Sequence, residues 1–141
     1  MGEFVVAQKS LILFNKKILL LQRASEDARG NSGNWELVGG CLEFGENLLE
    51  GLVREIKEET ELTARIDRLL CASTHVPTSA EQAKQFVFLY YLSYADTDRV
   101  KLSEEHTDYL WATRNQMIEI IDKSILNDLI SNKVLDTLEI E

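Results

Sequence analysis

Three glutamates with helical spacing are the residues best suited to chemistry in this sequence. Glu55 lies three residues before Glu58 and four before Glu59, so their carboxylates meet on one side of a helix. Each like-charge contact costs roughly a few tenths of a kcal/mol on an exposed helix, and partial burial raises the carboxylate pKa. A hard divalent cation such as Mg²⁺ removes this conflict and bridges to substrate phosphates. The spacing indicates a metal site, and a solvated acidic helix face is the alternative.

The surrounding residues predict a helix that buries one side. Asn47 is a suitable N-cap, and turns of about 100° per residue give an apolar arc of about 140°, formed by Leu48, Leu49, Leu52, Val53 and Ile56. Glu59 falls inside this arc, Glu55 just outside it and Glu58 further out. Gly51 costs roughly 1 kcal/mol relative to alanine in mid-helix. Its place on the side of Glu55 indicates that a ligand or a closely packed loop needs the space.

The rest of the chain predicts one α/β domain over residues 1–141. Apolar segments at 5–14 and 17–23 flank the polar pair Asn15–Lys16 and favour a hairpin. Further strands are expected at 35–38, 62–72 and 85–94, a helical tail at 116–130, and polar loops at 24–34, 74–84 and 103–108. Several strands with interleaved helices and no linker or repeat indicate layered α/β packing.

Composition limits the partners that this chain can take. The 141 residues are 45% apolar and carry a net charge of −9, which disfavours large nucleic acids and anionic membranes as partners. A small phosphorylated substrate stays compatible if metal ions bridge the repulsion. The apolar runs are too short to span a membrane, and the N-terminus has no targeting pattern. We therefore expect a cytoplasmic protein without a membrane segment, and a homodimer is left open.

The stretch from Gly40 to Leu62 resembles the signature of the Nudix hydrolases, G-x5-E-x7-R-E-U-x-E-E-x-G-U, where U is apolar. The matching positions are Gly40, Glu46, Arg54, Glu55, Ile56, Glu58, Glu59 and Leu62. Glu61 stands where the signature has a glycine that lets the helix end in a left-handed residue, so a different helix ending is expected. Upstream, residues 35–40 look like the family's W-x-x-P-G-G with Val38 in place of proline.

This resemblance implies an α/β/α sandwich around a mixed sheet, in which the signature forms a loop, a helix and a loop. It also implies a hydrolase that uses Mg²⁺ or Mn²⁺ to cleave a nucleoside diphosphate linked to another group X, with release of a nucleoside monophosphate. Glu55, Glu58 and Glu59 match the family's metal-binding carboxylates. Arg54 and Glu46 match a pair that positions the helix and its carboxylates.

The resemblance assigns further residues to the site. Gly39 and Gly40 allow the backbone to approach the metals closely. Glu58 and Glu105 are the two candidates for the carboxylate that takes the proton from water. Glu105 lies in the expected loop 103–108, where an extra glutamate often reaches the metals; a surface acid is the alternative. Arg23 suits a phosphate, because a guanidinium matches its oxygens, but a surface role fits equally well.

The substrate is less well determined than the chemistry. Pro77 lies fifteen residues after Leu62, and a proline at that offset is associated in the family with ADP-ribose and other nucleotide sugars. A nucleoside triphosphate, a dinucleoside polyphosphate, or a module that senses nucleotides without cleaving them are the alternatives. We expect His75 and His106 to lie in loops as surface or hydrogen-bonded residues. Core packing, rather than stacking on a base, is expected for most of the aromatic side chains Trp35, Phe86, Tyr90 and Tyr91.

Overall fold

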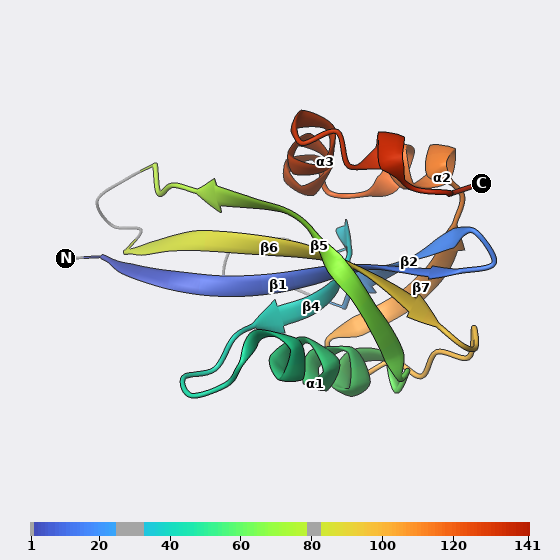
Figure 1. The fold of residues 1–141 in the computed structure, drawn as a ribbon, viewed down its shortest axis with the longest axis horizontal. Helices are drawn as coiled ribbons and strands as arrows, with labels where there is room; N and C mark the ends of the chain where they lie inside the picture. The colour runs from blue at the N-terminus through green and yellow to red at the C-terminus, as the bar shows by residue number, and fades with distance from the viewer. Residues whose placement is uncertain (1, 25–32, 79–82) are drawn as a thin grey trace.

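A mixed sheet with helices on both faces forms the fold of the computed structural model, which describes residues 2–24, 33–78 and 83–141 (Figure 1). The strands are β1 (Glu3–Phe14), β2 (Lys17–Arg23), β3 (Trp35–Glu36), β4 (Val38–Cys41), β5 (Ala64–His75), β6 (Lys84–Ala95) and β7 (His106–Ala112). The helices are α1 (Leu48–Thr60), α2 (Arg114–Ile120) and α3 (Lys123–Ser131), with a short 3-10 helix at Leu135–Thr137. Helix α1 covers one face, and α2 and α3 cover the other, as in an α/β/α sandwich.

Strand β1 organises the seven-stranded sheet. It pairs in parallel with β6 from Glu3 to Leu13, and antiparallel with β2 and β4. Asn15 and Lys16, with φ values of 49° and 62°, form the tight turn of the predicted β1–β2 hairpin, because two left-handed residues match the twist of the strands. The polar loops predicted at 24–34 and 74–84 lie partly outside the described residues, because residues 25–32 and 79–82 are not described.

The strand expected at 35–38 is instead two short strands with different partners. Strand β3 pairs with β2, where Glu36 lies opposite Leu21. The chain then crosses from β2 to β1 in the space between these two strands, and β4 pairs with β1, where Gly40 lies opposite Gln8. Gly39 and Gly40 therefore lie within a strand rather than after one. This switch brings Glu36 and the two glycines to one region of the sheet.

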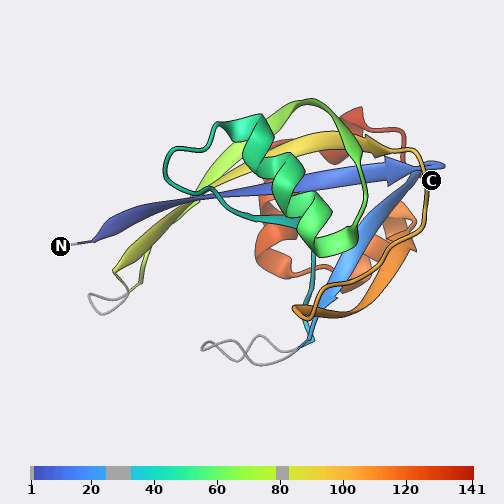
Figure 2. The ribbon, with the colours of Figure 1, turned by 90° about the horizontal axis from the view of Figure 1, so that it is seen from below.

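Helix α1 lies diagonally across the sheet (Figure 2) and packs through a narrower stripe than the helical wheel predicts. Asn47 caps it, because its side chain accepts a hydrogen bond from the Glu50 amide. The buried positions are Gly51, Leu52, Ile56, Glu59 and Thr60. Leu48 and Leu49 are exposed in the first turn, before this stripe begins, and Val53 is exposed at its border. The prediction that these three residues are buried is wrong, whereas Glu59 lies inside the stripe as expected.

The C-terminus of α1 ends in a left-handed residue although the family's glycine is absent. Glu61 has φ 60° and ψ 10°, and its amide donates to the Lys57 carbonyl. The expectation of a different ending is therefore wrong. Left-handed backbone costs a non-glycine residue about 1 kcal/mol. The Lys57 ammonium stabilises this turn, because it donates a 3.1 Å hydrogen bond to the Glu61 carbonyl.

Three other elements differ from the sequence-based expectations. Strand β5 extends to His75 and β7 begins at His106, so both histidines lie in strands rather than loops. The tail expected as one helix is broken into α2, which ends at Ile120, and α3. Asp122 lies at the break and caps α3, because its side chain accepts a hydrogen bond from the Ser124 amide. The Asp122 amide donates to the Trp35 carbonyl, which fixes this break against β3.

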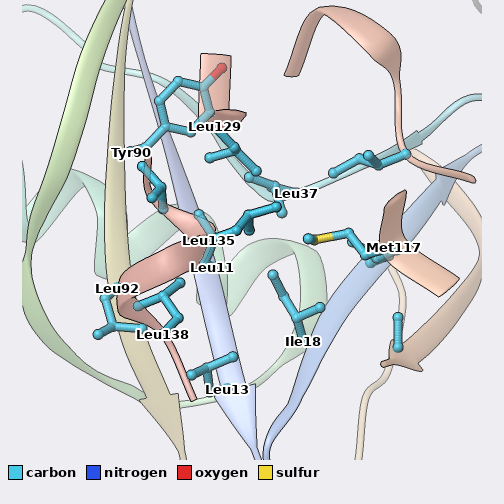
Figure 3. Close-up of a cluster of buried hydrophobic side chains, with 14 residues drawn as sticks. Leu11, Leu13, Ile18, Leu37, Tyr90, Leu92, Met117, Leu129, Leu135 and Leu138 are labelled. Carbon is cyan, nitrogen blue, oxygen red and sulfur yellow. The ribbon is translucent and has the colours of Figure 1, made fainter. Parts of the chain in front are cut away.

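The core lies on both faces of the sheet, since successive side chains of a strand point to opposite faces. Alternate residues of β1 and β2 pack against α2 and α3 in the cluster of Figure 3, which includes Leu11, Leu13, Ile18, Leu37, Tyr90, Leu92, Met117 and Leu129. The residues between them point to the opposite face and pack against α1. This second cluster includes Ile12, Leu19, Leu21, Val38, Leu52, Ile56 and Tyr91. Tyr90 and Tyr91 are buried core residues, as predicted. No helix within the described residues is long and apolar enough to cross a lipid bilayer.

A single carboxylate oxygen fastens α3 to the sheet. Asp128 Oδ2 accepts hydrogen bonds from Ser73 Oγ at 2.8 Å and Tyr90 Oη at 2.6 Å, and lies 2.9 Å from His75 Nε2. Burial and the neighbouring carboxylate raise the pKa of Tyr90, so this hydroxyl stays protonated and donates. The three partners come from β5 and β6, so one side chain joins α3 to two strands.

We expect Asp128→Ala to lower the free energy of unfolding by about 2–3 kcal/mol, because three polar groups lose their shared acceptor. Urea denaturation measures this change. Asp136→Ala is the matched control: it removes an exposed acid near the same end of the chain and should change stability by less than about 0.5 kcal/mol. Equal effects of the two substitutions would show that the Asp128 contacts do not hold α3.

Candidate active site

Glu59 is the most deeply buried of the signature carboxylates, with 6% of its surface exposed. Its Oε1 accepts a 2.8 Å hydrogen bond from the Gly39 amide. Gly39 has φ 148°, and a Cβ there would overlap the Gln8 carbonyl, so only glycine brings this amide to the carboxylate. Burial raises the pKa of Glu59 to about 7, although Lys9 and the Gly39 amide favour its charged form.

Glu55 lies beside the next glycine of the same strand. A Cβ on Gly40 would stand 2.5–2.8 Å from the carboxylate atoms of Glu55, so the absence of a side chain makes room for this carboxylate. Burial raises the pKa of Glu55, although Arg54 opposes the shift. The structure thus brings the glycines Gly39 and Gly40 against Glu59 and Glu55, one to each carboxylate.

Arg54 and Glu46 form a bidentate ion pair at the edge of the carboxylate cluster. Arg54 Nε and Nη2 donate to the two oxygens of Glu46 at 2.6 and 3.0 Å, which lowers the pKa of Glu46 to about 2. Arg54 Nη1 also lies 3.1 Å from Glu55 and 3.2 Å from Glu58. A Cβ on Gly51 would stand 2.9 Å from Glu46, so the missing side chain admits the packed loop, not a ligand.

Glu58 and Glu105 differ in their relation to the cluster. Glu58 is 58% exposed and points along the outer side of the helix toward Arg54. It lines an outer acidic hollow with Glu55, Glu59 and Glu105. Glu105 lies just before β7 and also lines a second, deeper pocket, where Glu55 and Glu59 lie beside Arg23 and Gly39. The structure therefore brings Glu105 to the carboxylates from a distant part of the sequence.

A buried ion-pair network borders the carboxylates, and sequence reasoning did not find it. Glu36 Oε2 lies 3.0 Å from Arg23 Nη1 and 3.0 Å from His106 Nε2, and Glu36 Oε1 lies 3.1 Å from Lys9 Nζ. Burial alone would raise the pKa of Glu36, but the charges of Lys9 and Arg23 and the hydrogen bond with His106 lower it to about 2. Burial would likewise lower the pKa of Lys9, but Glu36 and Glu59 raise it. A lone lysine in the apolar run 5–14 was the one available signal.

These groups line one pocket with a volume of about 510 Å³. Its charged end holds Glu55, Glu59, Glu105, Arg23, Gly39 and Gly40, and its other end is lined by His75, Phe86, Phe88 and Tyr90. Phe86 stacks on Phe88 with ring centroids 5.6 Å apart. Pro77 instead lines a separate hollow with Gly2 and Phe4, near the N-terminal end of β1. The structure does not bring Pro77 to the other site residues.

The donor set of the charged end fits a divalent cation. One oxygen each of Glu59 and Glu105 and one ring nitrogen of His106 all lie within 4.8 Å of one another, with Glu55 in the same pocket. The raised pKa values of Glu55 and Glu59 mark carboxylates whose charge the protein does not fully neutralise. Carboxylate oxygens are the ligands that Mg²⁺ and Mn²⁺ prefer.

Comparison with known proteins agrees with this geometry. A model of the NUDIX domain matches residues 7–131. Nucleoside triphosphatase NudI from Escherichia coli is 29% identical over 114 residues, which cover 76% of this chain and 81% of that protein. The crystal structure of the MutT protein from Methanosarcina mazei Go1 has a TM-score of 0.80 at 27% identity and covers 96% and 97% of the two chains. A C. elegans Ap4A hydrolase has a TM-score of 0.70 at 27% identity, with 93% and 96% covered.

The chain belongs to the NUDIX domain family. It is a hydrolase that acts on phosphoric anhydride bonds, a class whose members act on small nucleotides and generally use divalent metal ions. The family predicted from Gly40 to Leu62 is confirmed, and so is the predicted α/β fold with a mixed sheet.

The raised pKa of Glu59 gives the metal-free protein a defined pH dependence. Between the ordinary carboxyl pKa of 4.5 and about 7, the folded state holds a proton that the unfolded chain releases. In chelator, we therefore expect the free energy of unfolding to fall as pH rises through this window, by up to about 3 kcal/mol. Glu59→Gln should remove most of this fall, leaving the smaller contribution of Glu55, and should keep the hydrogen bond from Gly39. Urea denaturation between pH 4.5 and 8 measures both proteins.

Glu50→Gln, on the exposed side of α1, is the control for a lost surface charge and should keep the fall. The same slope in Glu59→Gln as in the wild type would contradict the assignment of this pH dependence to Glu59.

Proposed function

We propose that this protein is a Mg²⁺- or Mn²⁺-dependent pyrophosphohydrolase that cleaves a nucleoside diphosphate linked to another group X and releases a nucleoside monophosphate. The observation that carries the proposal is the convergence of Glu55, Glu59 and Glu105 with Arg23 in one pocket. These residues come from α1, the end of β2 and the position before β7, and carboxylates beside a guanidinium suit a cation and a phosphate chain together. The chemistry takes place within a single domain.

Nucleoside triphosphates are the substrates that we propose first. The similar E. coli protein is named a nucleoside triphosphatase, and a pocket of about 510 Å³ suits one nucleotide. The aromatic end, with Phe86 and Phe88, offers a surface for the base. ADP-ribose and other nucleotide sugars come second, because that preference rests on Pro77, which lines a different hollow. A dinucleoside polyphosphate is a third choice, supported by the similar Ap4A hydrolase.

The residues of the charged end have different roles in the proposed phosphoryl transfer. A cation held by Glu55, Glu59 and Glu105 would neutralise phosphoryl charge and lower the pKa of an attacking water. Arg23 donates to the phosphate chain and is held in place by its 3.0 Å contact with Glu36. Glu58 and Glu105 both line the outer hollow and are the two candidates for the proton acceptor. Arg54, paired with Glu46, positions α1 and its carboxylates.

The most direct test of the reaction is a panel of nucleoside triphosphates, nucleotide sugars and dinucleoside polyphosphates incubated with the protein and Mg²⁺, with products identified by mass. We expect a nucleoside monophosphate as product, pyrophosphate as the second product from triphosphates, and no turnover in excess chelator. In heavy-oxygen water, the label identifies the attacked phosphorus. Labelled orthophosphate with a nucleoside diphosphate left behind, or turnover that survives exhaustive chelation, would defeat the proposal.

Substitution of the metal-binding carboxylates should separate catalysis from folding. We expect Glu55→Gln and Glu59→Gln each to lower kcat/KM by at least about a hundredfold, since loss of one electrostatic contact to a transition state costs on the order of 3 kcal/mol. Metal-free thermal stability should stay equal or rise, because the amide removes a buried like charge. Glu50→Gln should leave both quantities unchanged. Near-normal turnover of either site variant, or its failure to fold, would contradict the assignment.

A further inference from the structure

His106 is a buried histidine at the boundary between the ion-pair network and the carboxylates. It begins β7, immediately after Glu105, and only 2% of its side chain is exposed. Its Nε2 lies 3.0 Å from Glu36 Oε2. In the part of the chain that the structure describes, its Nδ1 has no hydrogen-bond partner. One nitrogen of this ring is thus fixed, and the other is buried and unpartnered.

The contact with Glu36 decides which nitrogen carries the proton. Glu36 forms ion pairs with Lys9 at 3.1 Å and with Arg23 at 3.0 Å, and both cations favour its ionised form. An ionised carboxylate only accepts hydrogen bonds, so Nε2 must be the donor. In the neutral ring, the lone pair is then on Nδ1. The network around Glu36 therefore prepares Nδ1 as an electron-pair donor.

The surroundings of this lone pair suit a cation. A buried polar atom without a partner costs about 1–3 kcal/mol, and such atoms in a native structure call for an explanation. A nitrogen of His106 lies within 4.8 Å of carboxylate oxygens of Glu59 and Glu105, which also lie within 4.8 Å of each other. Glu36 already holds Nε2, so a cation among the three groups would contact the ring at Nδ1.

We propose that Nδ1 of His106 is a ligand of the catalytic divalent cation, together with Glu59 and Glu105. The inference rests on the proposed function and adds a nitrogen donor to its carboxylates. The arrangement of carboxylate, histidine and cation, in which the outer carboxylate fixes the ring, is common in metal sites. Imidazole suits transition metals better than Mg²⁺. The site therefore favours Mn²⁺ or Co²⁺ over Mg²⁺ by more than a site built from oxygen alone.

The chain offers substitutions that separate a ligand from a structural histidine. In His106→Gln, the side-chain amide can still donate to Glu36 in place of Nε2, but the ring nitrogen is lost. His75→Gln is the matched control, because His75 is the other histidine of the sequence and contacts Asp128 at the far end of the pocket. A purely structural His106 needs only the contact with Glu36, so His106→Gln should then leave metal binding unchanged.

Pulsed electron paramagnetic resonance of the untagged, Mn²⁺-loaded protein tests the proposal without any variant. We expect modulation from a coordinated imidazole ¹⁴N, which changes to the ¹⁵N pattern when histidine alone is labelled. The signal should persist in His75→Gln and vanish in His106→Gln. His106→Gln should also bind Mn²⁺ about tenfold or more weakly, with a smaller change for Mg²⁺.

The outcomes distinguish failure of the His106 proposal from failure of the proposed function. Mn²⁺ bound without a histidine nitrogen signal would overturn the role of His106, while metal-dependent nucleotide hydrolysis would leave the proposed function standing. A signal that survives in His106→Gln but vanishes in His75→Gln would also overturn the proposal. A protein that binds neither Mn²⁺ nor Mg²⁺ would overturn both the metal site and the proposed function.

Discussion

The burial of the Glu59 carboxylate is the constraint on which the rest of the site depends. A charge taken out of water must be paired, protonated or bound to a metal, and Glu59 has one backbone donor, the Gly39 amide, at hydrogen-bond distance. Its raised pKa shows that this donor and Lys9 together do not compensate for burial. The helix thus carries a cost in the metal-free state that a bound cation would relieve. If Glu59 binds the metal as proposed, metal binding and metal-free stability oppose each other at this residue.

The charged groups around Glu59 are paired with one another. Glu36 contacts Lys9, Arg23 and His106. These three side chains are therefore held by Glu36 and do not need Glu59 as their partner. On the outer side, Arg54 joins Glu46, Glu55 and Glu58. The two networks enclose the carboxylates from opposite sides. These ion pairs therefore keep the acidic pocket ordered in the absence of a cation or a substrate.

The sequence predicted the parts of the site that lie close together along the chain. The spacing of Glu55 and Glu59, the glycines beside them and the family all followed from one continuous segment. Residues that depend on pairing between distant strands could not be found this way: Glu36 reaches His106 only because β3 and β7 both pair with β2. The wheel misplaced Leu48, Leu49 and Val53 because it assumes a helix buried along its whole length. Pro77 was assigned by its offset alone, and no local pattern shows where a loop lies in space.

Metal-dependent unfolding tests whether Glu59 binds the cation, with Mg²⁺ or Mn²⁺ titrated into wild type, Glu59→Gln and Glu50→Gln at neutral pH. A ligand of the folded state stabilises it by RT ln(1 + [L]/Kd), about 2.7 kcal/mol at a hundred times Kd. We expect wild type and Glu50→Gln to gain stability with metal, whereas Glu59→Gln starts more stable and gains little. Equal metal-induced gains in Glu59→Gln and wild type, or a wild type that metal does not stabilise, would contradict this expectation.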